Sequence, residues 1–88
     1  MSTPVHALQG ALTIHHAVEL QAQLLQQLDA GTDTLDLSAV TDCDAAGVQL
    51  LLATDRSLRD SGRRLRLQAT PAVVAEVLQR CGLQALAA

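Results

Sequence analysis

Apolar and polar residues alternate at the start of the chain and then adopt a helical period. Val5–Gln9 alternates, Gly10 interrupts the pattern and Ala11–Ile14 resumes it, which predicts a short β-hairpin. Farther along, apolar residues recur at steps of three and four, at Ala17, Leu20, Leu24 and Leu28. This period predicts an amphipathic helix that begins near His16 and ends before Gly31.

A strand and a second helix are predicted in the middle of the chain. Thr34–Ser38 has a β-compatible pattern, and Ala39–Cys43 is predicted to be a loop. Asp44 is placed to be the N-cap of the next helix, because its carboxylate accepts orphan backbone N–H groups and matches the positive end of the helix dipole. Gly62 is predicted to end this helix. Its apolar stripe is formed by Val48, Leu51, Leu52 and Leu58.

The remainder of the chain predicts one more strand and one more helix. Arg64–Gln68 alternates cationic and apolar side chains, which is the pattern of a half-exposed strand. Thr70 is the predicted N-cap of the final helix, with Pro71 at its first position and Gly82 after its end. Its buried stripe comprises Val74, Val77, Leu78 and Cys81. The predicted order is β-β-α-β-α-β-α, an α/β arrangement with a mostly parallel sheet.

Composition is typical of a small soluble domain with an aliphatic core. The chain has 88 residues, 49% of them hydrophobic, and contains no Phe, Tyr or Trp. We expect a single domain over residues 1–88. No apolar run approaches the length of a membrane span and no signal peptide is apparent, so a cytoplasmic protein without direct membrane insertion is expected.

The charges are few and unevenly distributed. A net charge of -3 and the lack of aromatic side chains argue against nucleic-acid binding, because both a basic footprint and a stacking platform are missing. Residues 1–44 carry six acidic and no basic side chains, whereas residues 45–88 carry six arginines and three acids. One acidic and one basic face are therefore expected, which indicates docking to another molecule.

A longer motif runs from the predicted middle strand into the second helix. Leu35–Leu51 contains Asp-Leu-Ser at the end of the strand, a short connecting stretch and then Asp-Ala-Ala-Gly-Val at the helix start. This stretch resembles the signature of STAS domains, the family of bacterial anti-sigma factor antagonists. Gly10–Ile14, Gly62–Leu67 and Val73–Leu83 fall where that family has its hairpin, its next strand and its last helix. The resemblance implies a small mixed, mostly parallel β-sheet flanked by about three to four helices.

In STAS proteins that switch by phosphorylation, the phosphorylated Ser or Thr directly follows the motif aspartate or comes one position later. The resemblance places these positions at Ala45 and Ala46, and neither residue carries a hydroxyl. Because a phosphate adds roughly -1.5 to -2 charge at a helix N-terminus, the usual switch is predicted to be missing. Ser38 and Thr41 are hydroxyls nearby, and we interpret them as turn residues rather than displaced phosphoacceptors.

The resemblance implies a non-enzymatic regulatory protein that docks a signalling partner through the 41–47 loop and the second helix. Apolar contacts are expected at the helix start, with the loop acids fixing orientation and Gly47 permitting close packing. The predicted partner-binding residues are Thr41, Asp42, Cys43, Asp44, Ala45, Ala46, Gly47, Val48 and Gln49. The predicted partner is a signalling kinase, as in chemotaxis-associated STAS proteins, or an anti-sigma factor. An alternative is the ATPase of a phospholipid-transport ABC system, with this chain as its cytoplasmic STAS subunit.

The other chemistry-bearing residues are interpreted as structural. An enzyme or nucleotide-binding protein that uses the acidic loop is the alternative from another class. Asp42 and Asp44, with Asp36 nearby, could imitate a carboxylate metal site or a phosphoacceptor pocket there. Either would need companion residues that the chain lacks, so no metal, cofactor or catalytic activity is predicted. His15–His16 is interpreted as a solvated turn pair.

The cysteines and the arginine cluster receive similar interpretations. The acids beside Cys43 are expected to raise the pKa of its thiol, which excludes a catalytic or redox role, and Cys81 is predicted to be a small buried apolar residue. The cluster comprises Arg56, Arg59, Arg63, Arg64 and Arg66. It is interpreted as a solvated surface, with docking of a phosphate-rich or acidic partner as the alternative.

Overall fold

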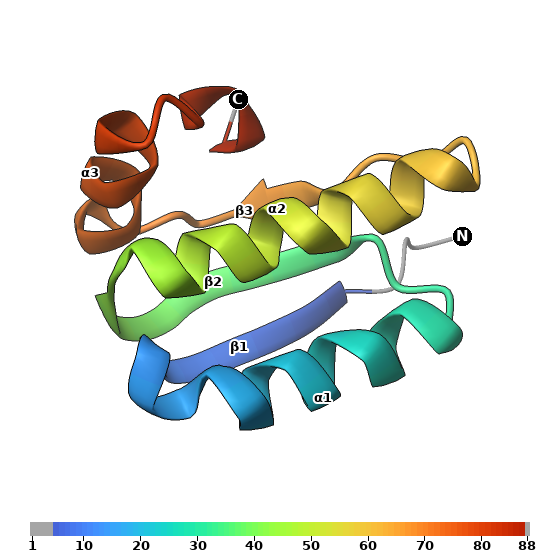
Figure 1. The fold of residues 1–88 in the computed structure, drawn as a ribbon, viewed down its shortest axis with the longest axis horizontal. Helices are drawn as coiled ribbons and strands as arrows, with labels where there is room; N and C mark the ends of the chain where they lie inside the picture. The colour runs from blue at the N-terminus through green and yellow to red at the C-terminus, as the bar shows by residue number, and fades with distance from the viewer. Residues whose placement is uncertain (1–4, 88) are drawn as a thin grey trace.

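Three parallel strands form the sheet in the computed structural model, which describes residues 5–87. Along the chain the elements are β1 (Val5–Leu12), η1 (Ile14–His16), α1 (Ala17–Asp29), β2 (Thr34–Cys43), α2 (Ala45–Asp60), β3 (Arg66–Gln68), α3 (Ala72–Arg80) and η2 (Gln84–Ala87), where η denotes a 3-10 helix. The strand order is β1-β2-β3, with β2 in the centre (Figure 1). The structure thus confirms the α/β class, and all strand pairs in the described residues are parallel.

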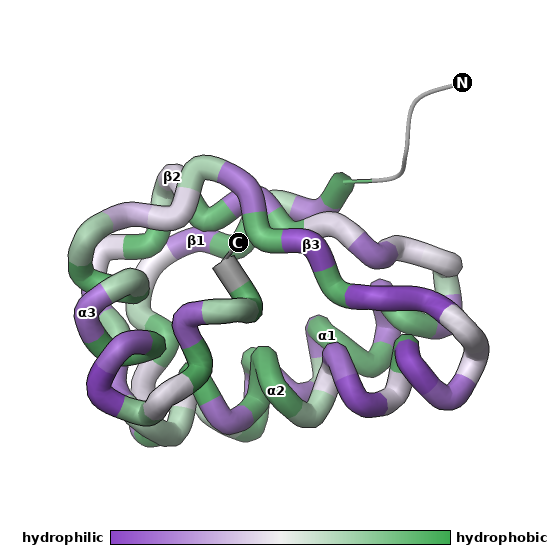
Figure 2. Tube along the Cα trace, turned by 90° about the horizontal axis from the view of Figure 1, so that it is seen from above, coloured by the Kyte–Doolittle hydropathy of each residue, from purple (hydrophilic) through white to green (hydrophobic). Residues whose placement is uncertain are grey.

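The three α-helices lie on one side of the sheet, so the molecule has two layers (Figures 1 and 2). Strand residues that face the helices are buried leucines, among them Leu8, Leu35 and Leu37, whereas Ala7, Gln9 and Ser38 are exposed on the opposite side. This alternation follows from the two-residue period of a strand. Parallel sheets are usually covered on both faces, and here the second face is polar and open in the described part of the chain.

The core between the two layers is entirely aliphatic apart from one cysteine. Its buried residues are Leu8, Leu12, Leu20, Leu24, Leu35, Leu37, Val40, Cys43, Val48, Leu51, Leu58, Leu65, Val74 and Leu78. The predicted stripes of the three helices therefore face the core. Each helix ends just before a glycine with positive φ, at Gly31, Gly62 and Gly82, as predicted. In residues 5–87, no helix combines the length and hydrophobicity that a bilayer crossing requires.

The predicted N-terminal hairpin is wrong, because Val5–Leu12 is one continuous strand. Gly10 adopts a φ of +81°, but the chain does not reverse there, and Gly10 pairs with Val40 of β2. The register between β1 and β2 shifts between Ala7 and Gln9 and again between Gly10 and Ala11. Ile14, which was assigned to the second hairpin strand, lies in η1. The element order is consequently one strand shorter than predicted.

Three boundaries also differ from the prediction, and one of them is the start of β3, which lies at Arg66 instead of Arg64. Ala39–Cys43 is not a loop, because β2 continues through Cys43 and pairs there with the end of β1. Pro71, not Thr70, is the N-cap of α3, and its carbonyl accepts hydrogen bonds from the N–H groups of Val74 and Ala75 at 3.0 Å each. Cys81 packs against the core but is only partly buried.

Candidate functional site

The junction between β2 and α2 is held by the carboxylate of Asp44. Oδ1 of Asp44 accepts a hydrogen bond from the Gly47 N–H at 3.1 Å, so Asp44 is the N-cap that the sequence predicts. Oδ2 accepts from the Ile14 N–H at 3.0 Å, and the N–H of Asp44 itself donates to the Leu12 carbonyl at 3.0 Å. One residue therefore ties the carboxyl end of β1 and the η1 turn to the start of α2. In open α/β sheets, binding sites lie at this edge, where the strands end.

Gly47 lies in the first turn of α2, directly against the backbone of β1. A Cβ built on Gly47 would sit 2.1 Å from the carbonyl oxygen and 2.7 Å from the carbonyl carbon of Leu12. No side chain fits in that space, and the neighbouring atoms belong to a backbone that Asp44 also fixes. The expectation that Gly47 permits close packing is thus confirmed, and the packing partner is the end of β1.

Hydrogen bonds from the Ile14 and Gly47 backbone N–H groups hold the pKa of the Asp44 carboxyl below its usual value. A group whose pKa is lower in the folded state stabilises the fold above its unfolded pKa, about 3.9 for Asp, and this contribution is lost as the pH falls through the folded pKa. We therefore expect Asp44→Asn to cost about 1 kcal/mol at neutral pH, because an amide oxygen cannot accept both N–H groups.

The difference between wild type and Asp44→Asn should shrink as the pH is lowered below about 4. Urea unfolding followed by far-UV circular dichroism over the acid range measures it. A difference that stays constant down to the lowest pH would contradict the assignment of the stabilising charge to Asp44.

The structure divides the nine predicted site residues into two groups. Thr41, Asp42, Ala45 and Gln49 are exposed, and Asp44 and Ala46 are half-buried. Cys43, Gly47 and Val48 are buried, with Val48 completely inaccessible. Val48 therefore cannot supply the apolar partner contact that the sequence suggested, because its side chain points into the core. The predicted 41–47 loop is also not a loop: its first part is the end of β2 and its last part is the first turn of α2.

Cys43 is an inert core residue at this junction. Burial raises the pKa of its thiol to about 11, and the neighbouring Asp44 and Asp42 carboxylates add to the increase. The predicted direction is correct, but burial contributes more than the acids. The Cys43 Sγ–H donates to the carbonyl of Asp44 at 3.6 Å. These features support a structural role for the thiol.

The acids and histidines near the junction are engaged locally. Asp36 accepts from the Ser38 N–H at 2.8 Å, which lowers the pKa of Asp36, and Asp42 accepts from the Cys43 N–H at 2.8 Å. His15 and His16 form the exposed η1 turn. In residues 5–87, no three His, Cys, Asp or Glu side chains converge as metal ligands.

Exposed apolar residues on α1 and η1 lie beside the junction, and the sequence prediction missed them. Ile14 is 65% exposed, Val18 83% and Leu25 54%. Val18 and Leu25 are seven positions apart and share one side of α1, next to the buried stripe. Val18 and Leu25 lie off the buried stripe of α1, and this position could have predicted their exposure. Ile14 was missed because the sequence analysis placed it in a hairpin strand.

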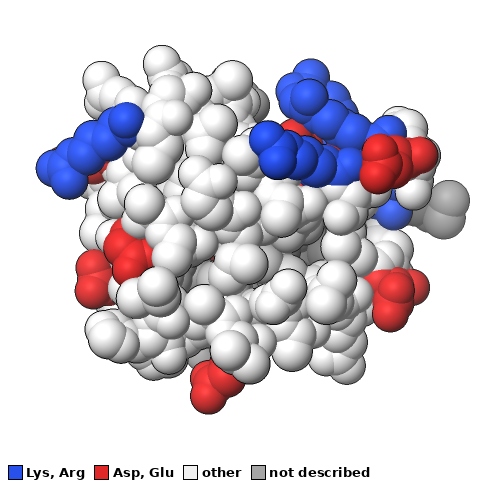
Figure 3. All heavy atoms as spheres, in the orientation of Figure 1, with Lys and Arg blue, Asp and Glu red and all other residues white. Residues whose placement is uncertain are grey.

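A shallow groove continues this apolar surface between α1 and α2. It has a volume of about 170 Å³ and is lined by Gln21, Leu24, Leu25, Leu28, Leu50, Ala53, Thr54 and Ser57. Figure 3 looks onto this helix layer and shows a broad uncharged area, with Asp, Glu and Arg side chains at its margins. We call the exposed surface formed by Ile14, Val18, Leu25, Ala45 and Gln49 the α1–α2 face.

Comparison with known proteins gives the chain a family. A family model described as "Mlab, STAS domain" matches residues 2–88. The structure of the anti-sigma factor antagonist SpoIIAA in its unphosphorylated form superposes with a TM-score of 0.75 at 24% sequence identity, covering 96% of this chain and 76% of SpoIIAA. No curated protein matches the chain. Since the family model spans nearly every residue and the SpoIIAA fold agrees with it, the chain belongs to the STAS domain family.

Proposed function

We propose that this STAS domain is a non-enzymatic regulatory module in the bacterial cytoplasm. The domain binds a signalling protein through the β2–α2 junction and the α1–α2 face. The observation that carries the proposal is the exposure of Ile14 and Val18 near Asp44, the N-cap residue of α2. Exposed apolar residues that cluster beside a rigid turn are typical of protein interaction sites. SpoIIAA is an anti-sigma factor antagonist, and this activity agrees with a role in binding another protein.

The chemistry of this surface fits a protein partner better than a small ligand. Its apolar side chains provide contact area, and the carboxylates of Asp42 and Asp44 lie at one margin, where they can orient a partner. The groove of about 170 Å³ is smaller than a typical ligand pocket and is open along α1 and α2. The small side chains of Ala45 and Ala46 at the helix start allow close approach of another backbone.

The start of α2 lacks a residue that could be phosphorylated to regulate binding. Ala45 and Ala46 are the first two residues of α2, where a phosphorylated side chain would meet free backbone N–H groups. Neither alanine can accept a phosphate, so the domain binds its partner without this switch, and control lies in the partner. The partner classes are a chemotaxis-type signalling kinase, an anti-sigma factor and, as the alternative, a phospholipid-transporter ATPase.

Charge placed on the α1–α2 face should abolish partner binding. Tagged wild type, Ala45→Glu and Val18→Glu are used to capture proteins from cells of the source organism, and the captured proteins are identified by mass spectrometry. We expect one protein of the three classes to be captured by wild type and reduced at least about tenfold by both variants, because each buries a charge against an apolar partner surface.

Ser61→Glu is the matched control, since Ser61 is an exposed small residue at the far end of α2, about 24 Å from the junction. It should capture the partner as well as wild type does. Equal capture by all four proteins would place the interface elsewhere and contradict the proposal. The identity of the captured protein decides between the three partner classes.

A further inference from the structure

The arginine cluster contains three side chains without an ion pair in the described residues. Arg59 Nε lies 3.0 Å from Asp55 Oδ2, and Arg63 contacts both Asp33 at 3.0 Å and the Gly31 carbonyl at 2.6 Å. The three unpaired arginines are Arg56, Arg64 and Arg66, all exposed. Figure 3 shows the basic side chains gathered over the C-terminal half of α2. Asp60 is the one exposed acid on that part of α2.

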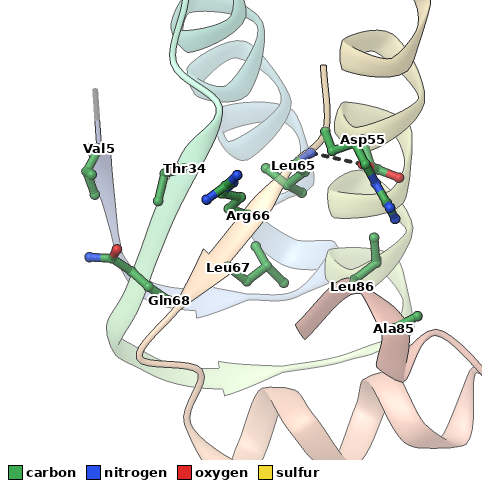
Figure 4. A pocket seen from close by; sticks show the side chains of 10 residues that line it. Val5, Thr34, Asp55, Leu65, Arg66, Leu67, Gln68, Ala85 and Leu86 are labelled. Atoms are coloured by element: carbon green, nitrogen blue, oxygen red, sulfur yellow. Dashed lines mark hydrogen bonds between the residues drawn. The ribbon is translucent and has the colours of Figure 1, made fainter. Parts of the chain in front are cut away.

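A depression borders these arginines along β3 (Figure 4). It has a volume of about 950 Å³ and is lined by Val5, Thr34, Asp55, Arg64, Leu65, Arg66, Leu67, Gln68, Ala85 and Leu86. A second hollow of about 280 Å³ shares Arg64 and Leu86 with it and adds Arg56, with Leu52 and Leu83 as apolar lining. Positive side chains therefore surround a recess whose walls include leucines.

In residues 5–87 the backbone of β3 has no strand partner on the side away from β2, and η2 packs near it. β3 is an edge strand, and β2 is the only strand in residues 5–87 that pairs with it. The Arg66 N–H donates to the Asp33 carbonyl at 2.8 Å, toward β2. Because successive residues of a strand direct their N–H and C=O groups to opposite sides, those of Leu67 point to the free edge.

A carboxylate already occupies part of this edge. The buried Asp55 accepts the N–H of Leu65 at 3.0 Å, which is the dashed line in Figure 4. Leu65 and Leu67 are two residues apart and direct their N–H groups to the same side, so the free edge continues past Asp55. A carboxylate of the chain itself is thus hydrogen-bonded to the residue that directly precedes β3.

We propose that the free edge of β3, with Arg56, Arg64 and Arg66, binds an extended acidic segment of a partner protein, which adds a fourth strand to the sheet. Backbone hydrogen bonds to Leu67 give the segment its position, and its carboxylates meet the arginines that alternate with leucines over residues 64–67. A flat membrane surface would reach the arginines but not the recessed backbone of β3, so a peptide segment is favoured over anionic lipid.

This surface is distinct from the one in the proposed function. The junction lies at the N-terminus of α2 and the arginines surround its C-terminal half, and a helix of 16 residues is about 24 Å long. One interaction can therefore fail experimentally while the other is retained. The acidic first half of the chain and its basic second half correspond in part to these two surfaces.

The probe is the capped, fluorescently labelled peptide Glu-Val-Glu-Val-Glu, with Lys-Val-Lys-Val-Lys as the matched control. We expect the acidic peptide to bind in fluorescence anisotropy, to lose affinity as salt is added and to shift the backbone amide resonances of residues 65–68 in NMR spectra. The same acidic peptide with methylated backbone nitrogens should bind at least about tenfold more weakly, because it cannot pair with the strand edge.

The variant Arg64→Glu/Arg66→Glu should weaken peptide binding at least about tenfold, whereas Arg80→Glu on α3 should leave it unchanged. Arg64→Gln/Arg66→Gln, which keeps the side-chain length, should weaken binding by a smaller factor and guards against misfolding of the first variant. The proposal is overturned by no binding, by equal binding of the lysine or methylated peptide, or by equal loss in Arg80→Glu. Binding to anionic vesicles without peptide binding, or self-association that blocks the same resonances, also overturns it.

Discussion

Replacing Gly47 with alanine is expected to destabilise the domain by about 3 kcal/mol or more. The added methyl group would meet the Leu12 carbonyl oxygen at 2.1 Å, and that backbone is fixed because the same carbonyl accepts the Asp44 N–H. Relief requires α2 to move away from β1, which would also strain the Asp44 hydrogen bond to Ile14. The loss is a large part of the total stability of a small domain.

Urea unfolding monitored by far-UV circular dichroism measures this effect, since the chain has no Trp or Tyr to provide a fluorescence signal. Ser57→Ala, an exposed change on the same helix, is the control and should alter the free energy of unfolding by less than about 0.5 kcal/mol. In a helix without a close neighbour, glycine to alanine stabilises by up to about 1 kcal/mol. A gain at position 47 would therefore refute the close approach of α2 to β1.

Asp55→Ala is expected to have the second largest effect, about 2 to 3 kcal/mol. Asp55 is 2% exposed, and its carboxylate accepts hydrogen bonds from the buried Leu65 N–H and from Arg59. Alanine leaves the Leu65 N–H without a partner inside the protein, and an unpaired buried donor is costly. Arg59 can turn toward water, because its side chain is 55% exposed.

Two further variants separate these contributions. Arg59→Ala should cost less than about 1 kcal/mol, since it removes only the partly exposed ion pair. Asp55→Asn keeps an oxygen that can accept from Leu65 and should retain more stability than Asp55→Ala. If Arg59→Ala is as damaging as Asp55→Ala, the ion pair within α2, and not the hydrogen bond from Leu65, accounts for the stabilisation by Asp55. Thermal unfolding of the same three variants by circular dichroism provides an independent ranking.

Features that depend on a few neighbouring residues were predicted from the sequence. The N-cap role of Asp44 needs only its own carboxylate and the helix that follows, and both are encoded locally. The same is true of the glycines that end the helices. The start of α2 at Asp44 was therefore located correctly, whereas the contact of Gly47 with the Leu12 backbone was not predicted.

Features that depend on distant strands were predicted wrongly. Gly10 is compatible with a turn and with a continuous strand, and only pairing with β2 selects the strand. Thr41 and Asp42 resemble loop residues, yet the end of β1 gives them a partner strand. Val48 was expected both in the apolar stripe of its helix and in the partner contact, and the packing of α2 on the sheet buries it completely.

Asp55 shows a signal that was present but not used. It lies seven residues after Val48 and three before Leu58, so it falls on the buried stripe of α2. A carboxylate on such a stripe needs a hydrogen-bond donor from another element. The donor is the backbone N–H of Leu65, and a backbone group cannot be recognised from the sequence because every residue except proline has one. The contact between Asp55 and Leu65 therefore emerged only from the structure.

The central position of β2 sets the order in which the chain can assemble during synthesis. β1 and β3 share no hydrogen bonds, so β1 and α1 have no strand to pair with until residues 34–43 have been made. When they have, a strand–helix–strand unit is complete while every arginine is still missing, because all six follow residue 44. Residues 1–44 thus carry acidic side chains and no Lys or Arg, and the ion pair between Asp33 and Arg63 closes only when β3 is about to join.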